Sequence, residues 1–329
     1  MYEPSYRSLY DSGELARRAD TLKTRLASCD ICPRTCHINR YEAKNGYCRS
    51  GNRISVSSYC DHHGEEPALS GTRGSGTIFF HSCNLACIYC QNYQISQGED
   101  RSAKEIDSRG LAEIMLSLQD EYGCHNINFV SPSHFAAQIV DALCHAVPMG
   151  LKIPLVYNTN AYDSLATLKL LDGVIDIYLP DIKYASDKWA VKFSQAKNYV
   201  LISRAAIKEM YKQVGNLQLD ALGVAQRGLI VRHLILPENL AGSSDSLRWL
   251  AQNLSKEVTV SIMAQYHPCH KAYAEPLLSR KITGREYRDV IELVEQLDIE
   301  NGWLQQMESS DLYLPDFNRE GHPFHKDPG

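Results

Sequence analysis

The chain has 329 residues and a formal net charge of -5, with 34 basic and 39 acidic residues. This balance provides no basic face of the kind that neutralises phosphates, so nucleic acid is not an expected partner. The first residues, MYEPSYRSLYDSGELARRAD, lack the apolar core of a signal peptide, so we expect the eleven cysteines to be reduced and the protein to be cytoplasmic. No apolar run approaches the length of a membrane span, which predicts a soluble protein without a membrane partner.

Four cysteines lie close together near the start of the chain, in the run CDICPRTCHINRYEAKNGYC. The thiolates of Cys29, Cys32, Cys36 and Cys48 can complete a tetrahedral zinc site or bind every iron of an iron-sulfur cluster. The spacing alone does not choose between these metals. Because a closed four-cysteine site has no free coordination position, we expect it to fold this segment or to relay electrons. A thiol-disulfide role for the first two cysteines is disfavoured, since two further cysteines complete the set.

From Ser75 to about Leu297, strand-like and helix-like patterns alternate. Apolar runs predict strands at residues 77–80, 127–130, 153–158, 173–179, 229–236 and 258–263. Helical periodicity predicts helices near residues 111–118, 135–146, 164–171, 187–195, 205–214, 244–254 and 283–297, with Ser108 as the cap of the first. Such alternation favours parallel strands joined by right-handed crossovers, in a doubly wound sheet or a barrel. Six units are too few for a closed eight-stranded barrel.

We therefore expect one large α/β domain with two appendages. Residues 1–63 would form a small Cys-rich N-terminal segment with a second metal site, residues 64–300 the core, and residues 301–329 an irregular C-terminal tail. The remaining cysteines, which are Cys60, Cys124, Cys144 and Cys269, are scattered along the chain, and each is expected to be a small buried hydrophobe.

Three further cysteines follow the first predicted core strand, in the run HSCNLACIYCQN. A cubane cluster is normally held by four thiolates, so the tight group of Cys83, Cys87 and Cys90 leaves one iron open to a substrate. In a parallel barrel this loop would lie at the carboxyl end of the strands, where active sites collect. The alternative is a structural zinc loop, which would need His81 or Cys60 as its fourth ligand.

This C-x3-C-x2-C run resembles the signature of the radical S-adenosylmethionine (radical SAM) superfamily, in which the open iron of a [4Fe-4S] cluster chelates the amino and carboxylate groups of SAM. Over residues 64–271 the chain is most similar to the pyruvate formate-lyase activating enzyme homologues, the PflX-like subgroup, through stretches such as GEEPALSG, VYNTNAYD, DGVIDIYLPDIKY, GLIVRHLILP and MAQYHP. The resemblance implies a partial (β/α)6 TIM-like barrel, open on one side. It also implies an oxidoreductase in which a reductant such as flavodoxin or ferredoxin drives SAM cleavage, and the resulting 5'-deoxyadenosyl radical abstracts hydrogen from a substrate.

The resemblance implies six SAM-binding residues, namely Tyr89, Asn158, Asp181, Lys183, Arg232 and His267. Lys183 follows a strand, where its ammonium can pair with the SAM carboxylate, and Asp181 would orient that lysine. Tyr89 can stack on adenine. Arg232 and His233 face opposite sides of their strand, so at most one points inward, and we expect it to be Arg232. Each residue also has an ordinary structural alternative, such as a surface lysine or a core tyrosine.

Two alternatives stay open from the sequence. Glycyl-radical activases carry a G-G-E-P-like turn after the second strand, whereas this chain has VSPSH at residues 130–134, where Ser131, Ser133 or backbone carbonyls would take over. The substrate can therefore be a glycine on a partner protein, another peptide, an RNA base or a metabolite. The second functional hypothesis is a non-catalytic metal-binding or electron-transfer iron-sulfur protein that uses both cysteine groups structurally.

Overall fold

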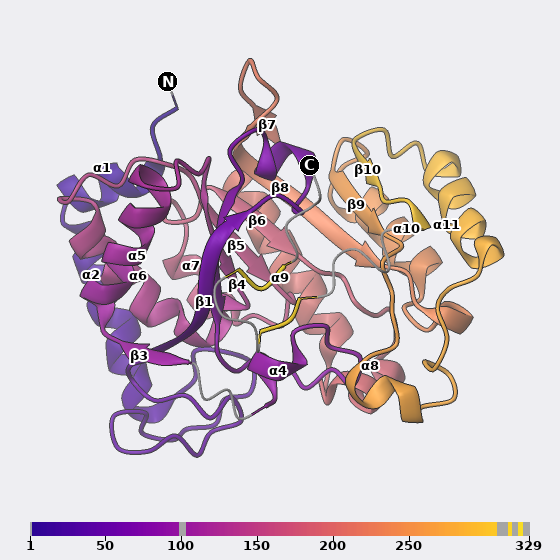
Figure 1. The fold of residues 1–329 in the computed structure, drawn as a ribbon, viewed down its shortest axis with the longest axis horizontal. Helices are drawn as coiled ribbons and strands as arrows, with labels where there is room; N and C mark the ends of the chain where they lie inside the picture. Colours follow the sequence, from indigo (N-terminus) through magenta and orange to yellow (C-terminus); the bar gives the residue numbers. More distant parts are fainter. Residues whose placement is uncertain (1, 99–102, 308–314, 318–321, 325–329) are drawn as a thin grey trace.

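The computed structural model describes residues 2–98, 103–307, 315–317 and 322–324 (Figure 1). It has a mixed α/β fold built on one large sheet, whose strands follow the order β10-β9-β8-β6-β5-β4-β2-β1-β3. One further short strand, β7 (Gln218–Leu219), pairs with β8.

All six predicted strands are present, with ends that differ by a few residues: β2 (Ser75–Phe80), β4 (Ile127–Val130), β5 (Leu155–Thr159), β6 (Ile177–Pro180), β8 (Ala225–Leu234) and β9 (Thr259–Met263). Neighbours within this set pair in parallel, so that Phe79, Val130 and Asn158 lie side by side at the carboxyl ends of their strands. Strands β2, β5, β6 and β9 are buried along their whole length, as expected where a parallel sheet is covered on both faces.

Besides the short β7, three strands of the sheet were not predicted. Strand β1 (Ile54–His62) runs antiparallel to β2, and β3 (Lys104–Ile106) runs antiparallel to β1. Strand β10 (Gly302–Leu304) continues the parallel sheet beside β9. β1 lies in the range assigned to the Cys-rich segment and β10 in the range assigned to the tail, so both appendages contribute a strand to the sheet.

The described helices cover the sheet on two sides (Figure 1). α1 (Ser5–Asp11), α2 (Glu14–Thr24), α5 (Ser108–Asp120), α6 (Ala136–Ala146) and α7 (Leu165–Leu170) gather beside β1 to β5, and α10 (Ser243–Asn253) and α11 (Gly284–Gln296) lie beyond β9 and β10. The other helices are α3 (Pro67–Ser70), α4 (Tyr93–Ser96), α8 (Asp187–Ser194) and α9 (Tyr199–Val214). Within the part of the chain that the structure describes, no helix combines the length and the apolar composition that a bilayer crossing requires.

The predicted cap of α5 was wrong by one residue. Asp107 caps the helix, because its backbone is extended and its carboxylate accepts a hydrogen bond from the Gly110 amide at 2.9 Å. Ser108 is already helical, and its hydroxyl donates to the Asp141 carboxylate on α6. By contrast, α11 begins at a capping box formed by Thr283 and Glu286, at the boundary that the sequence predicted.

Candidate active site

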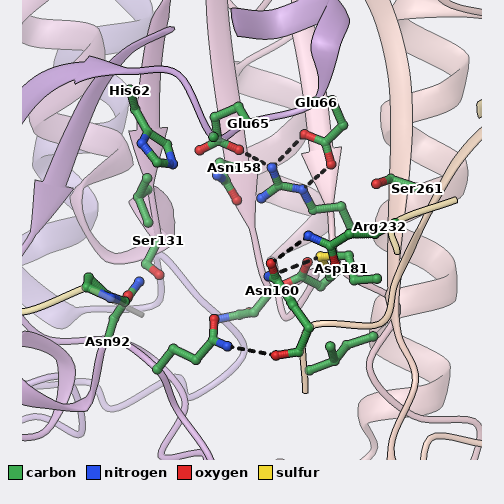
Figure 2. A pocket seen from close by; sticks show the side chains of 18 of the residues that line it. His62, Glu65, Glu66, Asn92, Ser131, Asn158, Asn160, Asp181, Arg232 and Ser261 are labelled. Carbon is green, nitrogen blue, oxygen red and sulfur yellow. Dashed lines mark hydrogen bonds and ion pairs between the residues drawn. The ribbon is translucent and has the colours of Figure 1, made fainter. Parts of the chain in front are cut away.

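A pocket of about 690 Å³ lies against one face of the sheet (Figure 2). Strands from both halves of the sheet contribute to its wall, through residues that include Phe79, Val130, Asn158, Arg232, Met263 and Trp303. Because strands from β2 to β10 face the same space, the sheet curves around the pocket. Its volume is within the range of about 300–1,000 Å³ that is typical of small-molecule sites.

The loop after β2 brings the three cysteines of the C-x3-C-x2-C run to the wall of this pocket. Cys83, Cys87 and Cys90 all line it, and all three are free thiols. The loop leaves the strand through Ser82, whose φ of 70° is in the left-handed region. It is held in place by a backbone hydrogen bond of 2.8 Å from the Ile88 amide to the Phe193 carbonyl at the end of α8.

Each of these sulfurs has a polar neighbour. The Leu85 amide and the Asn160 side chain donate to Cys83 Sγ at 3.4 and 3.5 Å. Ser194 Oγ donates to Cys87 Sγ at 3.0 Å, and Ser96 Oγ lies 3.3 Å from Cys90 Sγ. Donors to sulfur stabilise thiolate and tune the potential of an iron-sulfur cluster.

The thiols are protonated while no metal is bound. Burial raises the pKa of Cys83 to about 11 and the pKa of Cys90 to about 12. Burial also raises the pKa of Cys87, and the nearby Lys183 ammonium opposes this increase. Since iron binds thiolate, loading of these cysteines must release protons.

The donor set fits a cluster better than a single ion. The three thiolates are one ligand short of the four that a structural zinc requires. A cubane accepts three protein thiolates, because each binds a different iron and the remaining iron is open to a substrate. Cys60 instead packs with Phe79 and Ile95 in a small apolar cluster, which disfavours it as a fourth zinc ligand.

Asp181 and Lys183 lie where β6 ends, and both side chains reach the pocket wall. Lys183 Nζ and Asp181 Oδ2 are 2.5 Å apart. Burial alone would lower the pKa of Lys183, but the charge of Asp181 and its hydrogen bond with the lysine outweigh burial and raise that pKa, so the lysine stays charged. The Tyr199 hydroxyl accepts a hydrogen bond from the Lys183 amide at 3.0 Å, which fixes this turn.

Arg232 extends from β8 toward two glutamates in the loop between β1 and β2, as Figure 2 shows. Its guanidinium donates to both carboxylate oxygens of Glu66, at 2.7 and 2.6 Å, and also to Glu65. Burial alone would raise the pKa of Glu66, but Arg232 holds it below its usual value. Asn128 donates to Glu65 at 3.0 Å.

His233 points away from the pocket and bonds the Ile182 carbonyl at 2.9 Å.

The remaining predicted residues divide between the pocket and its surroundings. Asn158 lines the pocket at the end of β5. Tyr89 also lines it, but it is only 6% exposed and makes edge contacts with Tyr184 and Tyr266, so much of its ring packs in the core. His267 follows Tyr266 and is not among the described residues that line the pocket.

Sequence reasoning missed several residues of the site. Asn160 joins the cysteine loop to β5, because its amide donates to Asn84 at 2.8 Å as well as to Cys83. Ser131, by contrast, was offered by the sequence as a substitute for the activase turn, and it does line the pocket, with φ 56°, a left-handed conformation that costs free energy in a non-glycine residue. Glu65 and Glu66 were quoted only as part of a motif, although two adjacent acids before a short apolar helix are themselves a signal of a buried charged site.

The N-terminal cysteines lie outside this pocket, in the loop that follows a short 3-10 helix at Arg25–Ser28. Cys29, Cys32 and Cys48 are buried and Cys36 is partly exposed, and all four are free thiols. Their loop nevertheless contacts the pocket's cysteine loop through Arg34, which donates to the Asn84 carbonyl at 2.8 Å.

No family model matches this chain. It is 29% identical over 291 residues to the uncharacterized protein MJ0674 of Methanocaldococcus jannaschii, a match that covers 86% of this chain and 79% of that protein. Among solved structures it is similar to Streptococcus suis SuiB bound to precursor peptide SuiA, with a TM-score of 0.46, 12% identity and 74% of this chain covered.

It is also similar to HydG, a maturase of the [FeFe]-hydrogenase, with a TM-score of 0.47, 10% identity and 81% of this chain covered. The matched regions make up 51% of the SuiB chain and 55% of the HydG chain. The chain therefore spans about half the length of these two solved proteins.

Proposed function

We propose that this chain is a radical SAM enzyme that binds a [4Fe-4S] cluster at Cys83, Cys87 and Cys90 and cleaves SAM reductively. One observation carries the proposal: these three thiols, in the C-x3-C-x2-C spacing, line the same pocket as Asp181 and Lys183. Three thiolates leave one iron of a cubane without a protein ligand, and a pocket beside that iron gives a small molecule access to it.

When bound, the reduced cluster would supply the electron that splits SAM into methionine and a 5'-deoxyadenosyl radical, which then takes hydrogen from a substrate. The protein's own residues position the reactants. Lys183 would hold the SAM carboxylate as a compact positive charge, and Asp181 orients its ammonium. Asn158 presents an amide at the same wall. The apolar side chains of Phe79 and Leu85 reduce access of water to the pocket.

The same proposal extends to the fold and to the partners of the protein. A partial (β/α)6 barrel is supported by the six parallel strands and by the pocket that strands from β2 to β10 share. Its reductant would be a one-electron protein such as flavodoxin or ferredoxin. The activase-like role, in which the hydrogen donor is a glycine on a partner protein, is supported by the motif resemblance alone.

An anaerobic assay tests the proposal. The full chain is reconstituted with iron and sulfide, reduced with dithionite and given SAM, and 5'-deoxyadenosine is measured by chromatography. We expect 5'-deoxyadenosine from the wild type and none from Cys87→Ala. The non-catalytic alternative predicts bound iron without any product. A fully loaded wild type that forms no 5'-deoxyadenosine would overturn the proposal.

A further inference from the structure

We propose that Cys29, Cys32, Cys36 and Cys48 hold a second iron-sulfur cluster, and that this cluster passes electrons to the cysteine loop of the pocket. Only the electron acceptor in this proposal rests on the proposed function. The assignment of the second cluster stands on the N-terminal segment itself, which is described without gaps from residue 2 to residue 98.

The backbone folds the four thiols toward one another. The Cys29 amide donates to the Ile38 carbonyl and the His37 amide donates to the Cys29 carbonyl, both at 2.9 Å, which places the chain beside Cys36 against Cys29. The Tyr47 amide then donates to Cys36 Sγ at 3.4 Å, one residue before Cys48.

Cys32 completes the group. Its thiol is buried, and its carbonyl accepts a hydrogen bond of 3.1 Å from the amide of Thr35, the residue before Cys36. The turns around the group are strained, because Thr35 and Arg49, which adjoin Cys36 and Cys48, have φ values of 40° and 53°.

Contact with the pocket's cysteine loop favours a cluster over zinc. Four thiolates can complete a tetrahedral zinc site or bind every iron of a cubane. Zinc has no redox chemistry, whereas a cluster can exchange electrons with the pocket's cysteine loop, which this segment contacts through Arg34 and Asn84. With every iron ligated by protein, this site has no position for a substrate.

Arg34 brings a positive charge between the two cysteine groups. It follows Cys32 by two residues, and its guanidinium donates to the carbonyls of Asn84 and Gln195 at 2.8 and 2.6 Å. The rings of Tyr47 and Tyr162 lie 3.6 and 5.2 Å from the same guanidinium, so the side chain is held in place next to both loops.

The same residues form a continuous path between the two cysteine groups. Arg34 is joined to Cys32 through Pro33, and it contacts the carbonyl of Asn84, the residue that follows Cys83. The Tyr47 ring lies 3.6 Å from the Arg34 guanidinium. The Tyr47 hydroxyl donates to Gln195 Oε1 at 3.1 Å. Tyr47 therefore touches one group through its amide, and its ring packs on the arginine that contacts the other group's loop.

The electron count of the relay is simple. A low-potential one-electron protein donor reduces the second cluster by one electron. The second cluster returns to its oxidised state when that electron passes to the pocket's cluster. No bond forms or breaks at the N-terminal site, and no proton moves there.

Metal analysis tests the second cluster. We expect the anaerobically reconstituted full chain to contain about eight irons, about four of which are lost in Cys29→Ser/Cys32→Ser, as two four-iron clusters require. The matched control is Cys124→Ser/Cys144→Ser, which changes two thiols outside both groups and should retain all the iron. One zinc per chain that is lost only in the Cys29/Cys32 variant would overturn the assignment.

A second variant keeps the assignment testable if Cys29→Ser/Cys32→Ser fails to fold. Cys83→Ala/Cys87→Ala removes only pocket ligands, so it should retain about four irons and give an electron paramagnetic resonance signal on reduction. A variant with no remaining iron would contradict the second cluster. Because this readout needs no SAM cleavage, failure of the proposed function and failure of the second cluster give different results.

The choice of reductant tests the relay. In Cys29→Ser/Cys32→Ser, 5'-deoxyadenosine formation driven by reduced flavodoxin should fall at least tenfold relative to the wild type, whereas the rate driven by dithionite, a small reductant that reaches the pocket directly, should change less than twofold. Unchanged rates with both reductants would exclude the relay. An equal fall with both would show that the site only supports the fold.

Discussion

The pocket's three thiols and the buried charges of Arg232 and Asp176 are partnered differently. Each thiol has only one or two weak donors near its sulfur. By contrast, Arg232 bonds both Glu65 and Glu66, and the Asp176 carboxylate, just before β6, accepts hydrogen bonds from Tyr2 and the Leu155 amide. The thiols keep unused ligand capacity whereas the charged groups are fully paired, so we assign chemistry to the thiols and stability to the buried charges.

The largest expected effect is at the pocket's thiols. Replacement of Cys83, Cys87 or Cys90 by alanine should lower SAM cleavage by at least about a thousandfold, because the cluster loses a ligand. The free energy of unfolding of the metal-free chain should change by no more than about 1–2 kcal/mol. The control is Cys124→Ala, which should retain cleavage. Full SAM cleavage in any of these three variants would contradict the assignment of chemistry to the pocket's thiols.

The buried charges should show the reverse pattern. Arg232→Met leaves two carboxylates buried without their cation, so we expect a loss of about 3–5 kcal/mol in the free energy of unfolding, measured with urea on the metal-free chain. The variant Arg232→Met/Glu65→Gln/Glu66→Gln removes those charges as well and should recover most of that loss. Equal stability of Arg232→Met and the wild type would show that these charges do not support the fold.

Asp176 tests the role of the buried charges through the pH dependence of stability. Burial raises its pKa from 3.8 to about 6, although the hydrogen bonds from Tyr2 and Leu155 oppose this. Because the folded state binds the proton more tightly than the unfolded state, this group should lower stability by about 3 kcal/mol as pH rises from about 4 to about 6, with little change above.

This contribution can be isolated by measuring urea unfolding of the wild type and of Asp176→Asn across the same pH range. The asparagine variant lacks the titration, so its stability should decline less steeply with pH than that of the wild type. Parallel curves would mean that Asp176 titrates normally in the folded chain.

The smallest effect should be on SAM affinity. Lys183→Met/Asp181→Asn removes the pair without leaving a lone buried charge, and the loss of one charge-assisted contact predicts about tenfold to hundredfold weaker SAM binding. Anaerobic equilibrium dialysis of the iron-loaded chain measures this. The control Lys192→Met removes an exposed lysine that pairs with Glu275 away from the pocket and should leave affinity unchanged. Equal affinities would exclude Lys183 as a SAM contact.

The sequence predicted the parts of the fold that depend on local pattern. Buried parallel strands are continuous apolar runs, and such runs predicted six of the parallel strands, namely β2, β4, β5, β6, β8 and β9. β1 was missed because it alternates buried residues with Ser55, Ser57 and Ser58, and an antiparallel strand outside the βαβ rhythm is not marked by a crossover helix. The three residues of β10 are too few to show any period.

The site was predictable where motif and strand end coincide, as for the pocket's cysteines, Asp181 and Lys183. It was not predictable where contacts join distant segments. Arg232 meets glutamates that precede it by more than 160 residues, and Arg34 meets Asn84 across 50 residues. No local spacing encodes such contacts, because they arise only when the sheet curves and the N-terminal loop docks.

The central claim is that the pocket's three thiols leave an iron open to SAM. The most direct measurement is electron-nuclear double resonance on the reduced, iron-loaded chain with SAM carrying nitrogen and carbon isotope labels in its amino and carboxylate groups. We predict couplings from both labels to the cluster in the wild type and in Cys29→Ser/Cys32→Ser, and none in Cys87→Ala. A loaded wild type without any coupling would contradict the claim.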